Sequence, residues 1–355
     1  PRGSLVTHAA QNTTVEGNFK YKYVTSASTT FSNKTAISAH YNAIRSYDYF
    51  RSKFNRNSID GVGGTIISFI NVAEEDGSSM ENAFWNGEAM FYGNGGTAFR
   101  PLARGLDVGG HEMSHGVIQA TANLIYQNQS GALNESFADI FAVLIDNDDW
   151  KIGEDVVQSG VSPNGCLRDM QNPNNGASPS SGWWQPKDMS EIYTGTEDNG
   201  GVHINSGITN RAFYLFASNP TVGRDKAEQV YYKALRDYLV KSSKFLDCRL
   251  AVVRAAGELY GTAVADVAGA AFEAVGITTG TTTNYLGNLS PNPGTDFILC
   301  TLVNYSRIDM ANGNGVVLGT MYNRPIKSKP SMRDNGREFV FVNADGHIIG
   351  GTLVY

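Results

Sequence analysis

The chain has 355 residues, of which 41% are hydrophobic and 17% are charged, and its formal net charge is −6. A chain of this length can bury more than one hydrophobic core, so we expect two or three domains. The acidic balance, without a long basic run, argues against nucleic acid and anionic membranes as partners. No apolar stretch approaches the roughly 18 residues that would span a bilayer.

The first hundred residues are predicted to be rich in β-structure. Residues 1–4, Pro-Arg-Gly-Ser, are typical of a cleaved linker, and we interpret them as an expression-tag remnant. Residues 5–106 alternate apolar and polar side chains between Gly and Asn turns, as in residues 64–70. This pattern predicts a β-rich N-terminal lobe that contains one helix, over residues 35–54.

Residues 107–277 have the periodicity of helices instead. The clearest predicted helices cover residues 224–239, 246–260 and 263–275, and the last stops before Gly276, as helices often do. We therefore expect a mainly α-helical lobe here. A binding cleft is expected between the two lobes, because such sites form preferentially at domain junctions.

Residues 278–355 form a β-rich extension. A Thr- and Gly-rich stretch over residues 278–284 is typical of a linker, and strand-like runs follow over residues 297–303, 316–321 and 339–342. The last run is predicted to form a hairpin with residues 347–355 across Asn-Ala-Asp-Gly. The extension is either a small module that binds substrate or a cell surface, or a set of strands that braces the preceding lobes. Its short length favours the second interpretation.

The pentapeptide His-Glu-Met-Ser-His at residues 111–115 has the spacing of a zinc site. Histidines at i and i+4 lie on one face of a helix, and Glu112 beside them can accept a proton from a metal-activated water. A catalytic zinc needs a third protein ligand. Glu135 and Asp139, again at i and i+4, can supply it, one binding metal while the other hydrogen-bonds a ligand histidine.

Six ordered segments resemble the thermolysin-like zinc metalloproteases, the thermolysin/bacillolysin family of gluzincins. They are NAFWNG (82–87), GHEMSHG (110–116), LIYQN (124–128), GALNE (131–135), LRDM (167–170) and DNGGVHINSG (198–207). The resemblance covers residues 20–277, approximately. It implies an α+β fold of two lobes with the active-site cleft between them, and the activity of a metalloendopeptidase, a hydrolase.

The resemblance also implies the role of each residue at the reaction centre. One catalytic zinc ion would be held by His111, His115 and Glu135, with Asp139 behind a histidine. Glu112 would be the general base for metal-activated water. The remaining catalytic residues would be Tyr126 and His203, which donate to the carbonyl oxygen of the cleaved bond, and Asp198, which orients His203.

Substrate binding follows from the same resemblance. Asn82 and Ala83 would bind the peptide as an added strand, and Arg168 would hold the carbonyl of the residue just after the cleaved bond. An apolar pocket would be formed by Phe99, Leu102, Val108, Ile152, Val156 and Leu167. Such a pocket favours a large apolar residue, Leu, Ile, Val or Phe, just after the cleaved bond.

Four acidic residues match the calcium-binding region of the family: Asp107, Asp146, Asp149 and Glu154. Carboxylate oxygens suit this hard cation. The segment over residues 146–150 is shorter than the family pattern, and Lys151 stands where an acid is expected, so we predict one structural calcium ion rather than a pair. An acidic solvated loop is the alternative.

The family resemblance implies an extracellular protein. Its members are secreted with a signal and an inhibitory propeptide, and the polar, weakly charged composition suits secretion; we expect protein or peptide substrates and a monomer. The three cysteines, Cys166, Cys248 and Cys300, allow at most one internal disulfide. Two alternatives to an endopeptidase are a zinc aminopeptidase and a non-catalytic binding protein that acts through its extension.

Overall fold

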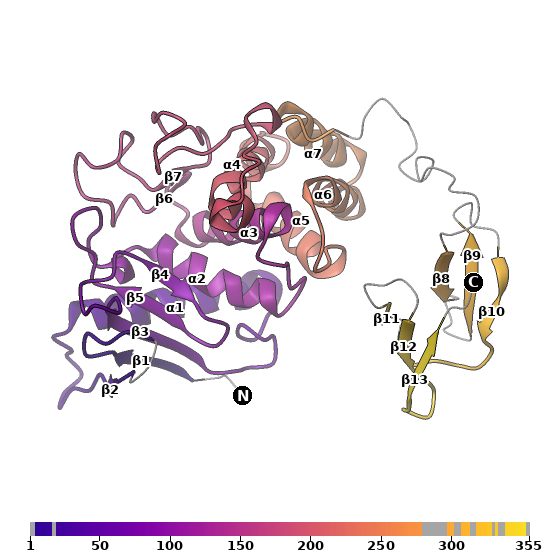
Figure 1. Ribbon diagram of the computed structural model, residues 1–355, viewed down its shortest axis with the longest axis horizontal. Coiled ribbons are helices and arrows are strands. Elements are labelled where there is room, and N and C mark those ends of the chain that lie inside the picture. The colour runs from indigo at the N-terminus through magenta and orange to yellow at the C-terminus, as the bar shows by residue number, and fades with distance from the viewer. Residues whose placement is uncertain are drawn as a thin grey trace. The chain divides into compact units, whose positions relative to one another are not determined.

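The computed structural model describes residues 4–15, 19–278, 297–301, 307–312, 317–328, 331–332 and 338–352. The chain divides into two compact units, residues 1–278 and residues 279–355. The first unit contains a sheet followed by helices and the second contains strands, so the predicted α+β fold is confirmed (Figure 1).

The N-terminal lobe is built on a five-stranded sheet with the strand order β2-β1-β3-β5-β4. Its strands are β1 (Leu5–Ala9), β2 (Lys22–Tyr23), β3 (Ile66–Val72), β4 (Ala83–Trp85) and β5 (Met90–Gly93). The three inner strands are parallel, whereas the edge strands β2 and β4 run antiparallel to their neighbours. Strand β4 is therefore an edge strand of the sheet, and it lies next to α2 (Leu106–Gln119) (Figure 1).

Helix α1 (Lys34–Phe54) confirms the helix that was predicted over residues 35–54. It begins where the Asn33 side chain accepts a hydrogen bond from the Ala36 N–H at 3.0 Å, and it ends at Asn55 in the left-handed conformation. Phe50 on α1 packs against Phe141 with ring centroids 5.2 Å apart. This contact joins the sheet lobe to the helical lobe through a continuous core.

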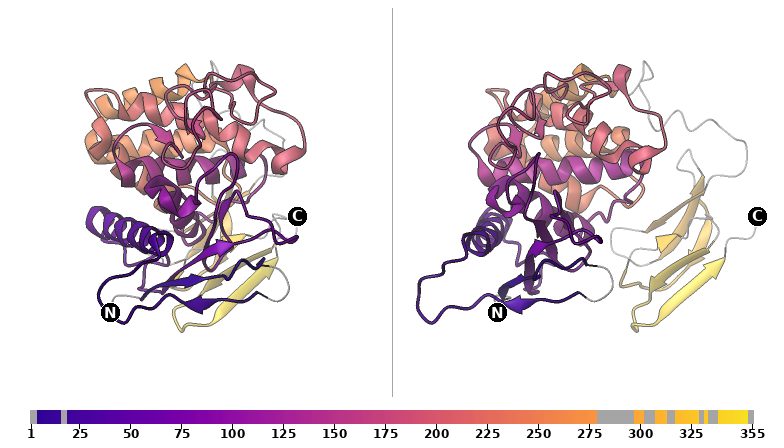
Figure 2. Two further views of the ribbon diagram at one scale, coloured as in Figure 1. Left: turned by 90° about the vertical axis from the view of Figure 1, so that its left-hand side faces the viewer. Right: turned by 60° about the vertical axis from the view of Figure 1, so that its left-hand side comes forward.

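The helical lobe follows from α2 onward, after the short helix η1 (Leu102–Arg104). Its helices are α2 (Leu106–Gln119), α3 (Asn128–Asp146), η2 (Met189–Glu191), α4 (Glu197–Ala217), α5 (Gly223–Asp237), α6 (Phe245–Tyr260) and α7 (Thr262–Ala274), with the short strands β6 (Lys151–Ile152) and β7 (Arg168–Asp169) before η2. The three helices predicted near its end are confirmed as α5, α6 and α7. Figure 2 shows α2 and α3 between the sheet and the later helices.

Helix α3 is the central element of this lobe. From Leu133 to Ile145 every side chain but that of Asn134 is buried, which is the pattern of a helix surrounded on all sides by protein. Two of those buried side chains, Glu135 and Asp139, are acidic. A buried carboxylate is costly unless it is paired or binds a metal, so these two residues mark a site rather than a packing position.

The second unit contains two antiparallel sheets. Their strands are β8 (Phe297–Thr301), β9 (Ile308–Asn312) and β10 (Val317–Tyr322) in one, and β11 (Ser331–Met332), β12 (Glu338–Val342) and β13 (Ile348–Thr352) in the other. The predicted final hairpin is confirmed, with Val342 opposite Ile348. Strand β9 was not predicted, because its buried Asp309 interrupts the apolar pattern and is paired with Arg307. The predicted linker over residues 278–284 lies, beyond its first residue, outside the described residues.

Two further features of the described residues bear on the sequence-based expectations. None of the helices in this part of the chain is both long enough and apolar enough to cross a membrane. Cys166 and Cys248 are buried and free, so they do not pair with each other. The side chain of Cys300 lies outside the described part of the chain.

Candidate metal centre and active-site cleft

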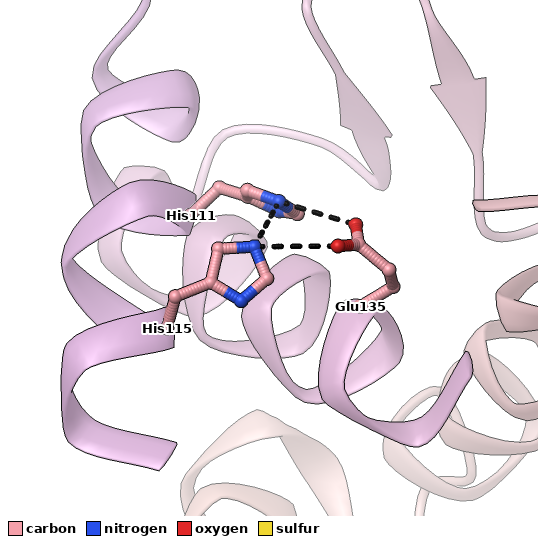
Figure 3. A group of neighbouring side chains, drawn as sticks. All are labelled: His111, His115 and Glu135. Atoms are coloured by element: carbon pink, nitrogen blue, oxygen red, sulfur yellow. Dashed lines mark hydrogen bonds and ion pairs between the residues drawn. The ribbon is translucent and has the colours of Figure 1, made fainter. Parts of the chain in front are cut away.

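Three side chains from two helices meet at one point (Figure 3). The Nε2 atoms of His111 and His115, one turn apart on α2, are 3.0 Å from each other. On α3, the Oε2 atom of Glu135 lies 3.4 Å from the His111 nitrogen and its Oε1 atom lies 3.4 Å from the His115 nitrogen. Two ligands bound at about 2.0 Å to a tetrahedral ion are about 3.3 Å apart.

The chemistry of this donor set fits zinc. Two imidazoles and one carboxylate leave a fourth position open, as catalytic zinc sites do. The Oε2 atom of Glu135, the oxygen beside His111, is buried and has no hydrogen-bond partner among the described residues. A buried carboxylate oxygen without a protein partner is expected where a cation binds.

Each ligand histidine is held from behind by a second side chain. The Nδ1 atom of His111 lies 2.8 Å from an oxygen of Asp139, and the Nδ1 atom of His115 lies 2.8 Å from the amide oxygen of Asn134. An acceptor at Nδ1 places the proton there and leaves Nε2 with a lone pair for the metal. Asn134 was missed in the sequence, although its position beside Glu135 on the same buried helix was a usable signal.

Asp139 is the centre of a buried polar network. It accepts hydrogen bonds from Arg168 at 2.8 and 2.6 Å and from the Asn210 amide at 2.8 Å, besides its contact with His111. Burial alone would raise the pKa of Asp139, but its partners Arg168 and His111 lower that pKa to about 2. Arg168 is therefore tied to the metal centre as well as placed in the cleft, a second role that the sequence did not indicate.

Glu112 lies between the ligand histidines in sequence and faces the same cleft. It is 6% exposed, and burial raises the pKa of its carboxyl to about 7. A carboxylate of that pKa can both take up and release a proton near neutral pH, which is what a general base that later acts as an acid requires.

A second group of donors comes from the start of α4. Residues 198–201 all have positive φ, between 51 and 82°, which turns the chain sharply before the regular helix begins. Two of the four are Gly, and Asp and Asn tolerate this region better than most residues. The turn lets Asp198 hold His203 by two contacts, to its backbone N–H at 2.7 Å and to Nδ1 at 2.6 Å.

His203 lies beside Tyr126 in the wall of the cleft. The hydroxyl of Tyr126 lies 3.0 Å from the Nε2 atom of His203 and also hydrogen-bonds Glu135. Burial and the nearby carboxylate of Glu135 raise the pKa of Tyr126 far above its ordinary value, so its hydroxyl keeps its proton. Burial alone would lower the pKa of His203, but the carboxylates of Glu135 and Asp198 raise that pKa above its ordinary value, which favours an imidazolium with a proton on each ring nitrogen. Tyr126 and His203 can therefore both donate a hydrogen bond beside the metal ligands.

These residues open into one cleft of about 1370 Å3. The cleft wall includes all nine residues that were predicted to bind substrate: Asn82, Ala83, Phe99, Leu102, Val108, Ile152, Val156, Leu167 and Arg168. Asp139 and Asp198 are not in the wall but lie behind it and support His111 and His203. Ala83 belongs to the edge strand β4, which places an edge of the sheet along the cleft.

The acidic residues form two groups that share Glu154. Asp107, Asp146 and Glu154 have carboxylate oxygens within 4.8 Å of one another, and so do Asp148, Asp149 and Glu154. Asp148 was missed in the sequence, where it looks like an ordinary loop residue. One oxygen of Asp107 and one of Glu154 are buried without a hydrogen-bond partner among the described residues.

The electrostatics of these groups favour a bound cation. Burial, and then repulsion between the carboxylates, raises the pKa of Asp107 to about 6, that of Asp146 to about 7 and that of Glu154 to about 8. A calcium ion would remove that repulsion and supply the missing partners. The cluster fits calcium in chemistry, and the count of one ion stays a prediction.

The chain belongs to the thermolysin metallopeptidase family. Residues 2–119 match the family's model of its catalytic domain, and residues 122–277 match the model of its alpha-helical domain. The junction falls after α2, so the first model includes the histidine ligands and the second includes Glu135. Residues 278–355 lie beyond both models.

Individual relatives agree with this assignment. The chain is 44% identical to a bacillolysin of Bacillus amyloliquefaciens over 78% of this chain and 51% of that protein. It is 42% identical to the neutral protease NprE of Bacillus pumilus, over 78% of this chain and 89% of the relative. It spans about half the length of the bacillolysins that it matches.

A solved structure is also similar, the precursor of protealysin, a metalloproteinase from Serratia proteamaculans. The TM-score is 0.68 at 32% sequence identity, covering 78% of this chain and 88% of that one.

Proposed function

We propose that this protein is a zinc-dependent endopeptidase that hydrolyses internal peptide bonds of proteins. The observation that carries the proposal is the convergence of His111, His115 and Glu135 at the spacing of a tetrahedral ion, with Glu112 in the same cleft. A zinc ion held by these three side chains would supply Lewis-acid activation of a water molecule and of the substrate carbonyl.

The chain's own residues then carry out the proton transfers. Glu112 takes a proton from the attacking water and passes it to the leaving amine, for which a pKa of about 7 is suitable. Negative charge develops on the carbonyl oxygen during the attack. Tyr126 and His203 donate hydrogen bonds to that oxygen, and Asp198 keeps His203 in the orientation this needs.

Substrate binding uses the edge strand and the apolar pocket. The peptide backbone adds to β4 as a further strand, with Asn82 and Ala83 as its partners. The residue just after the cleaved bond enters the pocket, whose walls include the buried side chains of Leu102, Ile152 and Val156. We infer a preference for a large apolar residue at that position, because burial of its side chain is worth about 25 cal/mol per Å2.

The remaining parts of the proposal concern the whole protein. Lobes at residues 5–106 and 107–277 form the catalytic unit, and residues 278–355 are an appended unit. Calcium at Asp107, Asp146, Asp149 and Glu154 stabilises the segment after α3, which carries Asp149, Glu154 and the pocket residue Ile152. We further propose secretion, a precursor with a propeptide, and a monomeric mature form; the similarity to a protealysin precursor supports the propeptide.

Cleavage of peptides with free and blocked N-termini tests this function. The zinc-loaded protein is incubated with both, with and without 1,10-phenanthroline and zinc add-back, and the products are read by mass spectrometry. Internal cuts before Leu, Ile, Val or Phe in both peptides, lost on chelation and restored by zinc, are expected. Removal of single residues from free N-termini alone would identify an aminopeptidase instead.

A further inference from the structure

Lys241 lines the same cleft as the zinc ligands, and the proposed mechanism does not use it. It lies in the turn between α5 and α6 and is exposed. In the described part of the chain the cleft wall has two Lys or Arg side chains, and the other, Arg168, is held by Asp139 at 2.6 Å. Lys241 is in no ion pair among the residues that the structure describes. Its charge is therefore available to a ligand in the cleft.

The backbone of Lys241 is fixed against the start of α3 and the segment before it. Its carbonyl accepts a hydrogen bond from the Ile125 N–H at 2.9 Å and another from the Ser130 hydroxyl at 2.9 Å. The turn itself is closed, because the Ser243 N–H donates to the Val240 carbonyl at 2.9 Å and the Val240 N–H donates to the Ser243 hydroxyl oxygen at 2.9 Å. The ammonium group is thus carried by a backbone of defined position, and only its own side chain adjusts to a ligand.

Helix α2 shows how the cleft is oriented. Val108, in its first turn, belongs to the pocket proposed for the residue just after the cleaved bond. The proposed zinc ligands His111 and His115 follow, and Gln119 at the end of the helix also lines the cleft. A helix rises about 1.5 Å per residue, so Gln119 lies about 9 Å along the axis from the midpoint of the two histidines, on the side away from the pocket. The half of the cleft near Gln119 is therefore where the substrate residues before the cleaved bond lie.

Lys241 lies in that half of the cleft. The Asn123 N–H donates to the Ile118 carbonyl at 2.8 Å, so the chain stays against the last turn of α2 after the helix ends. Ile125, two residues further on, lines the cleft with Asn123 and binds the Lys241 carbonyl. An extended peptide advances about 3.3 Å per residue, so the end of α2 lies beside the second or third residue before the cleaved bond.

We propose that Lys241 forms a basic subsite for an acidic side chain, Asp or Glu, at the second or third residue before the cleaved bond. The inference rests on the proposed endopeptidase function and deepens it, because it adds a charge preference at a second place in the substrate. Since the ammonium group is exposed, the ion pair is expected to favour Glu over the neutral Gln by only about two- to fivefold. Dissolved salt screens exposed charges, so the preference should disappear at high ionic strength.

A peptide series tests the subsite. Each peptide has Leu just after the cleaved bond and Glu, Gln or Lys at the second or the third residue before it, and kcat/KM is measured at about 20 mM and about 500 mM NaCl. At low salt wild type should prefer Glu over Gln by about two- to fivefold at one of the two positions, and at high salt it should show almost no preference. Equal kcat/KM for the Glu and Gln peptides at both positions in low salt overturns the subsite.

Three variants separate the subsite from the net charge of the protein. Lys241→Gln should remove the preference for Glu, and Lys241→Glu should make Lys the preferred residue at the same position. Lys244→Gln removes the same charge from the same turn but lies outside the cleft wall, so it should keep the preference. Equal loss of the preference in Lys241→Gln and Lys244→Gln would assign the effect to net charge and overturn the subsite.

A binding measurement distinguishes failure of the subsite from failure of the function. Glu112→Gln protein, loaded with zinc, is titrated with the Glu and Gln peptides at low salt by calorimetry. The Glu peptide should bind about two- to fivefold more tightly, and Lys241→Gln in the same background should abolish the difference. Equal binding of the two peptides overturns the subsite, whether or not wild type cleaves them. Absence of cleavage by wild type, with the binding difference intact, counts against the endopeptidase alone. Thermal unfolding and zinc content show that each variant is folded.

Discussion

The Asp139 carboxylate lies 2.8 Å from the Nδ1 atom of His111, and the same carboxylate accepts hydrogen bonds from Nε and one terminal nitrogen of the Arg168 guanidinium. One buried acid thus links a metal ligand to a residue of the substrate cleft. Its negative charge fixes the proton of His111 on Nδ1 and makes the imidazole a stronger ligand through Nε2. The metal centre and the cleft are therefore supported by one network.

Replacement of Asp139 by Asn should weaken zinc binding by about 10- to 100-fold, because the neutral amide stabilises His111 less well as a ligand. Competition against a chromogenic chelator measures the affinity. Asn210→Ala removes a neutral partner of the same carboxylate and should cost much less. Equal losses in the two variants would mean that packing, not the charge beside His111, governs the affinity.

His203→Ala should lower kcat by about 10²- to 10³-fold with little change in KM, because its hydrogen bond is made to charge that develops only in the transition state. Steady-state kinetics on a quenched peptide measures both constants. Asp198→Asn keeps the ring but weakens its orientation, so a smaller loss of kcat is expected. A rise in KM at unchanged kcat in His203→Ala would place the residue in ground-state binding instead.

Calcium removal should destabilise the protein, because the carboxylates of Asp107, Asp146 and Glu154 then repel one another. Calcium at 100 times its dissociation constant adds about 2.7 kcal/mol to the free energy of unfolding. Differential scanning calorimetry in EGTA and in calcium measures this difference.

Glu154→Gln is the informative variant for the calcium cluster, since the sign of its effect depends on the ion. It should raise the melting temperature in EGTA, where it relieves repulsion, and lower it in calcium, where it removes a ligand. A loss of stability of the same size in both buffers would show that Glu154 is needed for packing rather than for calcium.

Glu81 should make stability depend on pH at the mouth of the cleft. Its carboxylate accepts backbone hydrogen bonds from Thr97 at 2.6 Å, Ala98 at 2.8 Å and Phe99 at 3.0 Å. Partial burial opposes the shift, but these bonds lower the pKa of Glu81 below its ordinary value of 4.5. These hydrogen bonds to the ionised carboxylate therefore stabilise the folded state fully above pH 4.5. That stabilisation is lost as the pH falls through the lowered pKa of Glu81 in the folded state.

Glu81→Gln tests that dependence. The variant should lose about 1 kcal/mol of unfolding free energy at pH 7, and it should lose less than wild type when the pH is lowered from 5 to 3. Urea unfolding at each pH measures the difference. Parallel pH profiles for the two proteins would show that Glu81 does not titrate differently on folding.

Much of the fold and of the metal centre could be predicted from local pattern. The i, i+4 spacing of His111 and His115 is a property of one helix, and the apolar periods of α5, α6 and α7 are likewise local. The final hairpin was predictable because its turn sequence sets the register. Strand β9 was not, because the buried Asp309, paired with the partly exposed Arg307, interrupts the apolar alternation on which strand prediction depends.

The contacts that shape the cleft could not be predicted from local pattern. His203 and Tyr126 have no spacing rule that joins them, and only the family resemblance indicated that they converge. The contact of the Lys241 carbonyl with Ile125 falls in no motif, so neither kind of reasoning could find it. Each depends on how a loop folds back on a distant element, which the sequence of the loop alone does not determine.

The most direct test of the proposed mechanism is the rate of peptide cleavage by Glu112→Gln at full zinc occupancy. Zinc content is measured on the same samples, so that loss of metal and loss of the base are distinguished. The mechanism predicts unchanged zinc binding and a fall in kcat of about 10²- to 10⁴-fold, because the general base is gone while His111, His115 and Glu135 are intact. A zinc-loaded Glu112→Gln protein that cleaves at the wild-type rate would contradict it.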